Sequence, residues 1–379
     1  MRRRLPPDHS LLATAVAGAS FLVAWGLIHR GFYAESPIID TPTYQRFGDA
    51  MAHGLVPYRD FPVEYPPGAL PVFAVPELFN GYDAAFGWLM AFCGVGVLAA
   101  ASLIRTAAAL YVAISPLLVG SLILTRFDLW PTLLVVAALA ALLGERERLG
   151  WGLLGAAVAA KVWPAVLVPL VATWAWRRRR LRAAWSGVAV LAACVLPFAV
   201  LAPHQLWSSL SGQASRPLQI ESLASAFITT FGDPRIITTH GSQNVAGHTT
   251  VSFLIALLQI GVLVSLWVAF ARGPATSERL LRYSAASVCA FIALGKVLSP
   301  QFLIWLVPLV PLVRGVRGAV ATALLTAALI LTQVWFPARY WDYVYGHELA
   351  AVVLARDLVL VALLAVLALP ARRVTPARA

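Results

Sequence analysis

The two lysines of the sequence, Lys161 and Lys296, are candidates for binding chemistry, because every other residue of the Lys/Arg group is an arginine. Each lies between short apolar runs and is followed by valine and then proline, in AAKVWPAVLVPL and GKVLSPQFLIWLVPL. A charged side chain within such apolar sequence is costly and usually faces a cavity or a ligand path, and interrupted helices often surround binding sites in membrane proteins. We interpret the two ammonium groups as contacts for a lipid-linked phosphate. The alternative is that they extend toward lipid headgroups beside proline kinks.

Asp40 is the candidate for acid–base chemistry. It comes just after the first apolar run, in IIDTP, and is therefore expected close to the membrane surface. Glu64 and Tyr65, in EYPPG, close the same polar segment, where two prolines prevent simple continuation of a helix. A carboxylate beside cationic phosphate-binding groups can take the proton from an acceptor hydroxyl. The alternative is that Asp40 caps a helix or forms a salt bridge within the loop.

Two further pairs of charges interrupt the apolar sequence. Arg126 and Asp128, in LILTRFDLWP, lie at a predicted helix junction, where they either join the site or form an ion pair with one another. Arg216 and Glu221, in SRPLQIESL, form a similar polar island. We assign Arg126 to the donor-phosphate group with the two lysines. The residues assigned to substrate binding are Glu64, Tyr65, Asp128, Arg216, Glu221 and, from the second lysine segment, Gln301.

His240 and His248 lie in a polar segment rich in glycine and threonine, and they join the candidates for substrate binding. Without a third ligand nearby they do not predict a metal site. Cys93, Cys194 and Cys289 are scattered through apolar runs, with the spacing of neither a disulfide framework nor a metal site. No metal and no other cofactor is therefore assigned.

The elements that must position these residues are membrane helices. Of the 379 residues, 60% are hydrophobic and 12% are charged, about half the charged fraction of an ordinary soluble protein. The apolar runs are long enough to cross a hydrocarbon layer of about 30 Å, and in lipid they must be helical. Because they are continuous rather than alternating, they exclude an outer-membrane barrel. The predicted fold class is all-α.

About 10–12 membrane segments are predicted, within a single integral membrane domain over 1–379. A short proline-interrupted stretch at 68–79 is expected to be re-entrant or interfacial. The predicted segments are 10–28, 84–104, 107–124, 128–143, 150–161, 163–176, 183–202, 251–271, 282–298, 300–313, 318–335 and 349–370.

The charges predict the orientation of these segments. The net charge is +12, and the arginines cluster in short loops whereas the carboxylates concentrate in longer ones. This is the positive-inside pattern, which serves topology and anionic lipid headgroups rather than nucleic acid. The first apolar run lacks a convincing cleavage site, so we expect an uncleaved first span with the amino terminus inside. The loops at 29–67 and 203–250 are then extracytoplasmic, and the basic tail at 371–379 is cytoplasmic.

Several of these segments, in their order along the chain, resemble glycosyltransferase family 87. The motifs that carry the resemblance span roughly residues 35 to 315 and are IIDTPTYQRFGDAMAHGLVPYRDFPVEYPPGALP, TRFDLWP, AAKVWPAVLVPL, SRPLQIESL and GKVLSPQFLIWLVP. The family includes bacterial polyprenyl-phosphate-mannose-dependent mannosyltransferases that act on phosphatidylinositol mannosides. The resemblance implies a GT-C-type helical bundle with a large first extracytoplasmic loop, and catalysis on the outer face of the cytoplasmic membrane.

By this resemblance, Asp40 corresponds to the catalytic aspartate after the first span. The expected reaction moves a hexose, mannose in the characterised members, from polyprenyl phosphate to a lipid or glycan acceptor. Lys161, Lys296 and Arg126 would stabilise the departing phosphate, Asp40 would act as general base, and direct displacement would invert the anomeric configuration. The lipid-linked donor is a co-substrate, and membrane lipids are the surroundings. A catalytic histidine proposed in relatives has no clean match here; His240 and His248 are the candidates.

Two other classes of protein remain open from the sequence. A transporter or flippase of a lipid-linked or anionic substrate would also place charges among broken helices, but it has little need for a long acidic, aromatic-rich outer loop. A non-catalytic lipid-binding protein derived from an enzyme would retain the same motifs. Transfer of sugar from a purified lipid-linked donor would separate both from an enzyme.

Overall fold

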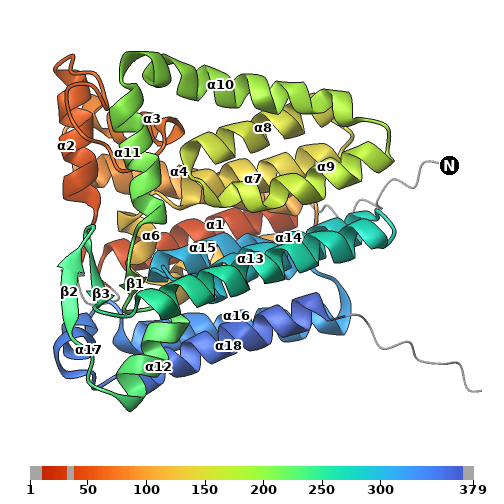
Figure 1. Cartoon of the computed structure of the whole chain (residues 1–379). Coiled ribbons are helices and arrows are strands. Elements are labelled where there is room, and N and C mark those ends of the chain that lie inside the picture. Colours follow the sequence, from red (N-terminus) through yellow and green to blue (C-terminus); the bar gives the residue numbers. More distant parts are fainter. Residues whose placement is uncertain (1–10, 32–37, 370–379) are drawn as a thin grey trace, which may run out of the picture.

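The protein is described by a computed structural model that covers residues 11–31 and 38–369. The amino-terminal arginines, part of the first polar loop (32–37) and the predicted tail at 371–379 lie outside the described residues. Within the described part, helices dominate and run roughly alongside one another (Figure 1). The predicted all-α architecture is confirmed.

Helical structure occurs at each of the twelve predicted segments. Within the described part of the chain, however, only six helices are long and apolar enough to cross a membrane alone. The others are shorter because prolines or polar junctions interrupt them, and a 14-residue helix reaches only about 21 Å. The helices are α1 (Leu11–His29), α4 (Tyr82–Ser102), α5 (Thr106–Val119), α7 (Leu129–Leu143), α8 (Glu147–Ala160), α9 (Val168–Arg177), α10 (Ala184–Leu201), α13 (Thr249–Arg272), α14 (Ser277–Ala293), α15 (Leu303–Leu309), α16 (Gly315–Trp335) and α18 (Ala350–Ala368).

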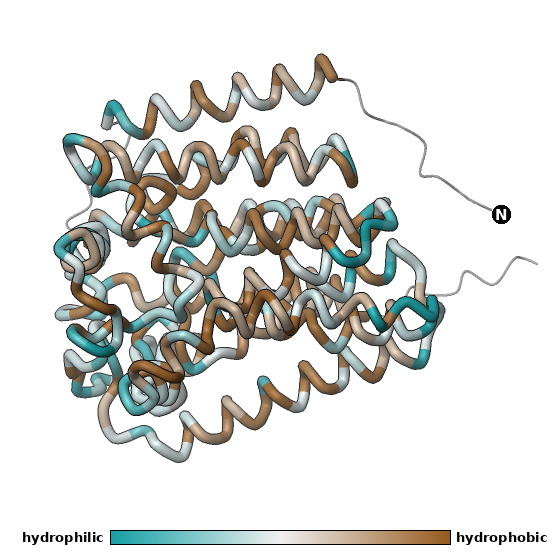
Figure 2. Tube along the Cα trace, turned by 90° about the horizontal axis from the view of Figure 1, so that it is seen from above, coloured by the Kyte–Doolittle hydropathy of each residue, from teal (hydrophilic) through white to brown (hydrophobic). Residues whose placement is uncertain are grey.

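The connections divide the molecule into two ends. One end, called the loop end below, collects the long polar segments, whereas short arginine-bearing turns form the opposite, arginine end (Figure 1). Hydrophilic residues gather at both ends and hydrophobic ones between them, as Figure 2 shows. The loop end contains α2 (Thr41–Ala52), α3 (Leu70–Ala74), α6 (Leu122–Thr125), α11 (Pro203–Ala214), α12 (Leu223–Phe231) and α17 (Tyr340–Gly346).

Four of these short helices, α2, α11, α12 and α17, lie in segments for which no helix was predicted. Helix α2 lies within the first polar loop, where Pro42 in its first turn supplies the fixed backbone angle that suits a helix start. Helix α17 lies in a polar stretch between α16 and α18 for which no element was predicted. Both are short amphipathic pieces packed against the bundle, so hydropathy alone does not reveal them.

A small antiparallel sheet covers part of the loop end. Its strands are β1 (Leu218–Gln219), β2 (Ile236–Thr239) and β3 (Ser242–Val245), in the order β1-β3-β2. His240 and Gly241 form the two-residue turn between β2 and β3, and both have positive φ, at 53° and 65°, as a tight hairpin turn of this kind requires. The amide of Gln219 donates to the carbonyl of Lys296 (2.9 Å), which joins the sheet to the segment after α14.

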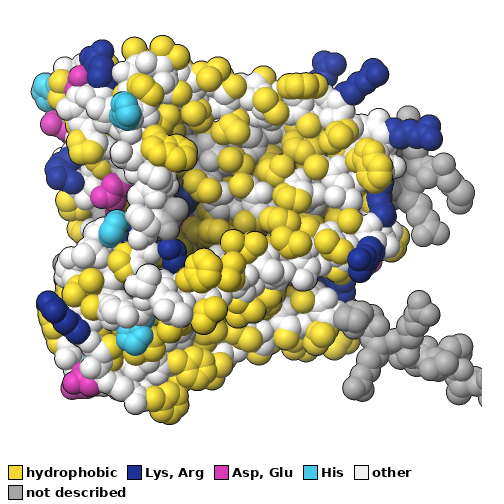
Figure 3. All heavy atoms as spheres, in the orientation of Figure 1, with side chains coloured by type: hydrophobic (Ala, Val, Ile, Leu, Met, Phe, Trp, Pro, Cys, Tyr) yellow, Lys and Arg dark blue, Asp and Glu magenta, His cyan; other side chains and the backbone are white. Residues whose placement is uncertain are grey.

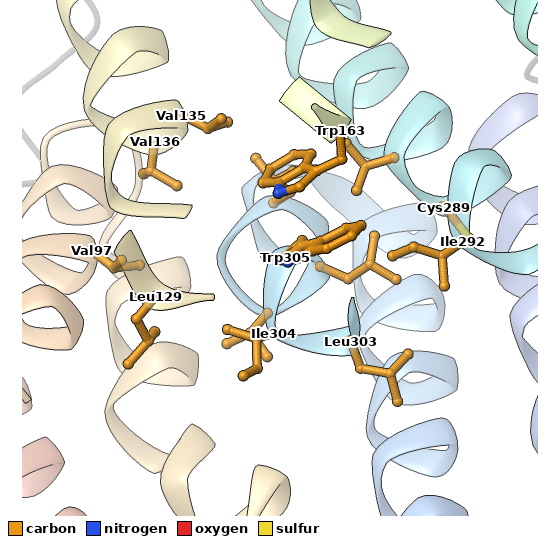
Figure 4. Close-up of a cluster of buried hydrophobic side chains, with 14 of the residues drawn as sticks. Val97, Leu129, Val135, Val136, Trp163, Cys289, Ile292, Leu303, Ile304 and Trp305 are labelled. Carbon is orange, nitrogen blue, oxygen red and sulfur yellow. The ribbon is translucent and has the colours of Figure 1, made fainter. Parts of the chain in front are cut away.

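The core beneath the loop end is built around stacked tryptophans. The rings of Trp163 and Trp305 lie parallel, with centroids 4.8 Å apart (Figure 4). Both side chains are fully buried, and their neighbours include residues of α7 and α14. The two tryptophans belong to the helical segments that follow Lys161 and Lys296, so their stacking packs these two segments against each other.

Candidate active site

Asp40 occupies the N-cap position of α2, yet its side chain makes no capping hydrogen bond. Its carboxylate instead forms an ion pair with Arg126 and accepts a hydrogen bond from the Tyr44 hydroxyl (3.2 Å). The Arg126 guanidinium also donates to the carbonyl of Ile38 (3.1 Å). The Asp40 side chain is 33% exposed and that of Arg126 only 4%. The carboxylate is therefore accessible to a substrate, whereas the guanidinium that pairs with it is buried.

Asp128 and Lys161 form a second ion pair beside the first. The Lys161 ammonium lies 2.6 Å from Oδ1 of Asp128, and the same oxygen accepts from the Trp305 indole at 2.6 Å. The ammonium also lies over the rings of Phe127 (4.6 Å) and Phe302 (5.6 Å). Charge attraction and cation–π contacts therefore hold this amine in one position.

These pairs settle the partners of Arg126 and Asp128. An ion pair between the two neighbours was one interpretation of the sequence; the structure instead pairs Arg126 with Asp40 and Asp128 with Lys161. Burial lowers the pKa of Arg126 to about 10, with the Asp128 charge opposing the shift. At neutral pH its guanidinium is therefore still charged.

The Glu64–Gly68 segment reaches this site through a close backbone contact. A Cβ on Gly68 would lie 2.6 Å from backbone atoms of Ala159 and Ala160, at the last turn of α8 before Lys161. The Gly68 carbonyl accepts a hydrogen bond from the indole of Trp130 in the first turn of α7 (3.1 Å). Glycine at this position thus lets the loop pack directly on the helix end that carries the lysine.

Tyr65 lies in the aromatic layer between the loop and the bundle. Its ring is 5.0 Å from that of Phe127 and 5.8 Å from that of Tyr44. The Tyr58 hydroxyl donates to the Tyr65 carbonyl at 2.5 Å. Burial raises the pKa of Tyr65 well above its ordinary range, so the phenol is neutral and available as a hydrogen-bond donor.

Glu221, Arg216 and Tyr340 form a second polar group next to Arg126. Glu221 is 3% exposed, and burial raises the pKa of its carboxyl to about 7, with the charges of Arg356 and Arg216 and a hydrogen bond with Tyr340 opposing the shift. Arg216 donates to the Ser242 hydroxyl of β3 (2.9 Å). The charge of Glu221 also acts on Arg126, so the two polar groups are coupled.

Arg356 and Asp357 lie behind this group, inside α18. Both are fully buried, and Nε of Arg356 is 2.6 Å from Oδ1 of Asp357. Arg356 also donates to the backbone carbonyl of Glu221 (2.9 Å). The charges that interrupt the last apolar run thus pair with one another and support the Glu221 segment.

A pocket of about 490 Å³ adjoins the site at the loop end. It brings Glu64 and His240 together and adds His204, at the start of α11, which the sequence did not single out. An exposed histidine after a proline carries no distinguishing sequence signal. The remaining lining residues are Pro62, Val63, Gln205, Ser208, Ser209 and Gly212.

Three predicted site residues lie in other elements than the Asp40–Arg126 and Asp128–Lys161 pairs. Lys296 is half-buried between α14 and α15, joined to β1 through its carbonyl. Gln301 is half-buried in the short 3-10 turn before α15, and His248 occupies the N-cap position of α13. Among residues 11–31 and 38–369, no group of three His, Cys, Asp or Glu side chains is placed to hold a metal ion.

The surface between α10 and α13 is hollowed, as Figure 3 shows in the orientation of Figure 1. Its walls are mostly hydrophobic, and Lys or Arg side chains appear at the end beside α11. Few residues of the two flanking spans are buried inside the protein: the buried share is 6% for residues 181–201 and 17% for α13, against 56% for α4. A groove open to the side of the bundle therefore leads toward the loop end.

These features define a multi-pass helical membrane protein with paired buried charges at one end. Residues 63–300 match the model of glycosyltransferase family 87, more than half of the chain, and the chain belongs to that family. The protein is therefore a membrane glycosyltransferase. A search of curated proteins found no match. The matched range contains Arg126, Asp128, Lys161 and Lys296, whereas Asp40 precedes it.

Proposed function

We propose that the protein transfers a hexose, mannose by the family resemblance, from polyprenyl phosphate to a lipid or glycan acceptor on the outer face of the cytoplasmic membrane. The observation that carries this proposal is the Asp40–Arg126 pair, in which a partly exposed carboxylate is held against a buried cation. The arginine end would face the cytoplasm under the positive-inside rule, which leaves the site outside.

In this mechanism the acceptor hydroxyl attacks the anomeric carbon from the face opposite the phosphate. Asp40 takes the hydroxyl proton as the new glycosidic bond forms. The bond from the anomeric carbon to the phosphate oxygen breaks, polyprenyl phosphate leaves with the bonding electrons, and the configuration inverts. The transition state has oxocarbenium character, as in glycoside hydrolysis.

The fixed cations would stabilise the charge that grows on the phosphate. Arg126 and Lys161 are held in place before substrate binds, by Asp40 and Ile38 in one case and by Asp128 and aromatic rings in the other. Such preorganised charge costs no rearrangement during the reaction. Lys296, at the same end, is the third cation of the proposed phosphate site.

The two openings of the site suit two different substrates. The hydrophobic groove between α10 and α13 fits the polyprenyl chain of a donor that enters from the bilayer (Figure 3). The pocket lined by Glu64, His204 and His240 offers hydrogen-bonding groups to a hydroxyl-bearing acceptor. A flippase, the second candidate, would use the groove but has no need of this pocket, and the family membership favours the enzyme.

The test is transfer by the purified protein in lipid nanodiscs, with radiolabelled polyprenyl-phosphate mannose and a membrane lipid extract as acceptor. Asp40→Asn should lower transfer by about 10²–10⁴-fold, the usual contribution of a general base, while the protein stays folded. Asp49→Asn, in the same helix and 63% exposed, is the matched control and should transfer normally. Transfer by Asp40→Asn within threefold of wild type would remove Asp40 from the mechanism, and transfer from a nucleotide sugar alone would contradict the donor class.

A further inference from the structure

A second groove of about 550 Å³ lies at the arginine end, far along the bundle from the candidate active site. It runs between α1, α5 and α16 and is open at Leu110 and Ile114, which are 49% and 48% exposed. Small side chains line much of it. The lining residues are Ala17, Ser20, Arg105, Ala107, Leu110, Tyr111, Ala113, Ile114, Pro311, Gly315, Gly318, Ala319 and Thr322.

Positive charge is concentrated at the outer end of this groove. Arg105, between α4 and α5, donates through Nη1 to the carbonyls of Pro311 (2.8 Å) and Val313 (2.5 Å). Burial lowers the pKa of Arg105, and the nearby charge of Arg314 lowers it further. Among the described residues, 11–31 and 38–369, those that line the groove include no carboxylate. Arg314 is exposed and directly precedes Gly315 of the groove lining. Its guanidinium and that of Arg105 together complement an anion.

The groove has the length of one lipid leaflet. Along α5 it extends from Arg105 to Ile114, which is about 13 Å at 1.5 Å per residue. Half of a typical hydrocarbon core is about 15 Å. Alanines and glycines on all three helices leave the space that larger side chains would fill. The depth and width therefore fit an acyl chain that starts at the arginines.

We propose that this groove holds an anionic glycerophospholipid of the leaflet at the arginine end, with its phosphate at Arg105 and Arg314 and an acyl chain along α5 and α16. The lipid joins α1, α5 and α16 from outside, at the turn where α16 begins. Anionic lipids concentrate in the leaflet that faces basic loops, which supplies the ligand. This site is independent of the proposed sugar transfer.

Native mass spectrometry of the full-length protein tests the site, with phosphatidylglycerol and phosphatidylcholine of identical acyl chains as probes. Wild-type protein should retain phosphatidylglycerol at least fivefold more than phosphatidylcholine. Arg314→Gln should abolish this preference; Arg314 is exposed, so the variant is expected to fold. Ala319→Trp, which fills the groove and keeps both arginines, should reduce retention of both lipids. Arg148→Gln, an exposed arginine at the same end, is the control and should bind as wild type does.

The position of the bound lipid is tested by cross-linking with a photoactivatable phosphatidylglycerol and by mapping the labelled peptides. Labelling of residues 105–114 or 315–322, lost in Ala319→Trp, supports the proposal. Equal retention of the two lipids by wild type, unchanged retention in both variants, or labelling confined to α10 and α13 would overturn it.

Discussion

The carboxylate of Asp40 forms an ion pair with the guanidinium of Arg126, although the two residues belong to different parts of the bundle, the start of α2 and the junction between α6 and α7. Because the arginine is buried and the acid is partly exposed, the pair is anchored from the protein side. A substitution at Arg126 that keeps the positive charge therefore acts on catalysis mainly through the position of Asp40.

Arg126→Lys tests this anchoring. Lysine keeps the charge but cannot bind Asp40 and the Ile38 carbonyl together with one planar group. We expect kcat to fall by about 10–100-fold, as small misplacements of catalytic groups commonly cause. Arg46→Lys, on the exposed side of α2, should leave kcat unchanged. Equal kcat in wild type and Arg126→Lys would show that catalysis does not depend on the planar guanidinium that binds Asp40 and the Ile38 carbonyl together.

The Asp128–Lys161 pair is predicted to matter for stability as well as for binding. Asp128→Asn leaves the Lys161 ammonium without its counter-charge among aromatic rings, which should cost about 3–5 kcal/mol. The double variant Asp128→Asn/Lys161→Met should recover part of this loss. Thermal unfolding in detergent measures both. Arg339→Gln, which breaks an exposed pair with Asp342, should change stability by at most about 1 kcal/mol. A double variant less stable than Asp128→Asn would argue against the pairing.

Gly68 is predicted to control how the first loop seats on the bundle. Its Cβ in Gly68→Ala would meet the backbone of Ala159 and Ala160 at 2.6 Å, which cannot yield as a flexible side chain could. The loop should move away from Lys161, and kcat/KM should fall at least tenfold. Gly261→Ala, at an open position of α13, is the control. Normal transfer with an unshifted cross-linking pattern between loop and α8 would rule out this role.

Glu221 should make the unfolding free energy depend on pH. Its pKa is about 7 in the folded protein against an ordinary value of 4.5, so between these pH values the folded state holds a proton that the unfolded state releases. Stability should therefore fall as pH rises from about 4.5 to 7, by about 3 kcal/mol at most. Glu221→Gln should flatten this dependence, whereas Glu278→Gln, exposed at the start of α14, should not. A pH profile of Glu221→Gln that matches wild type would contradict the assignment.

The sequence predicted the helices well because long apolar runs mark the segments that lie in lipid, and in lipid the backbone must be helical to satisfy its own hydrogen bonds. The alternation of the predicted segments also puts Asp128, at the start of 128–143, and Lys161, at the end of 150–161, at the same end of the bundle, as the structure has them. Which acid pairs with which base depends on packing between distant elements, so the Asp40–Arg126 pair could not be derived from spacing.

Other parts of the site depend on contacts that leave no local pattern. The close approach of Gly68 to α8 requires only a missing Cβ, which looks in sequence like an ordinary turn glycine. Tyr340 was detectable in principle: its polar, aromatic-rich segment between two apolar runs has the same character as the first loop. His204 carried no such signal.

The adjacency of Arg356 and Asp357 bears on how the chain is inserted during synthesis. A lone arginine or aspartate at the centre of a nascent span costs about 2.5–3.5 kcal/mol on the translocon scale. Because this segment carries its own counter-ion on the adjacent residue, it can enter the lipid as a formally neutral unit before it packs against α16 and the Glu221 segment. Loss of either charge alone would therefore first make insertion of this span into the membrane less favourable, and then destabilise the folded protein.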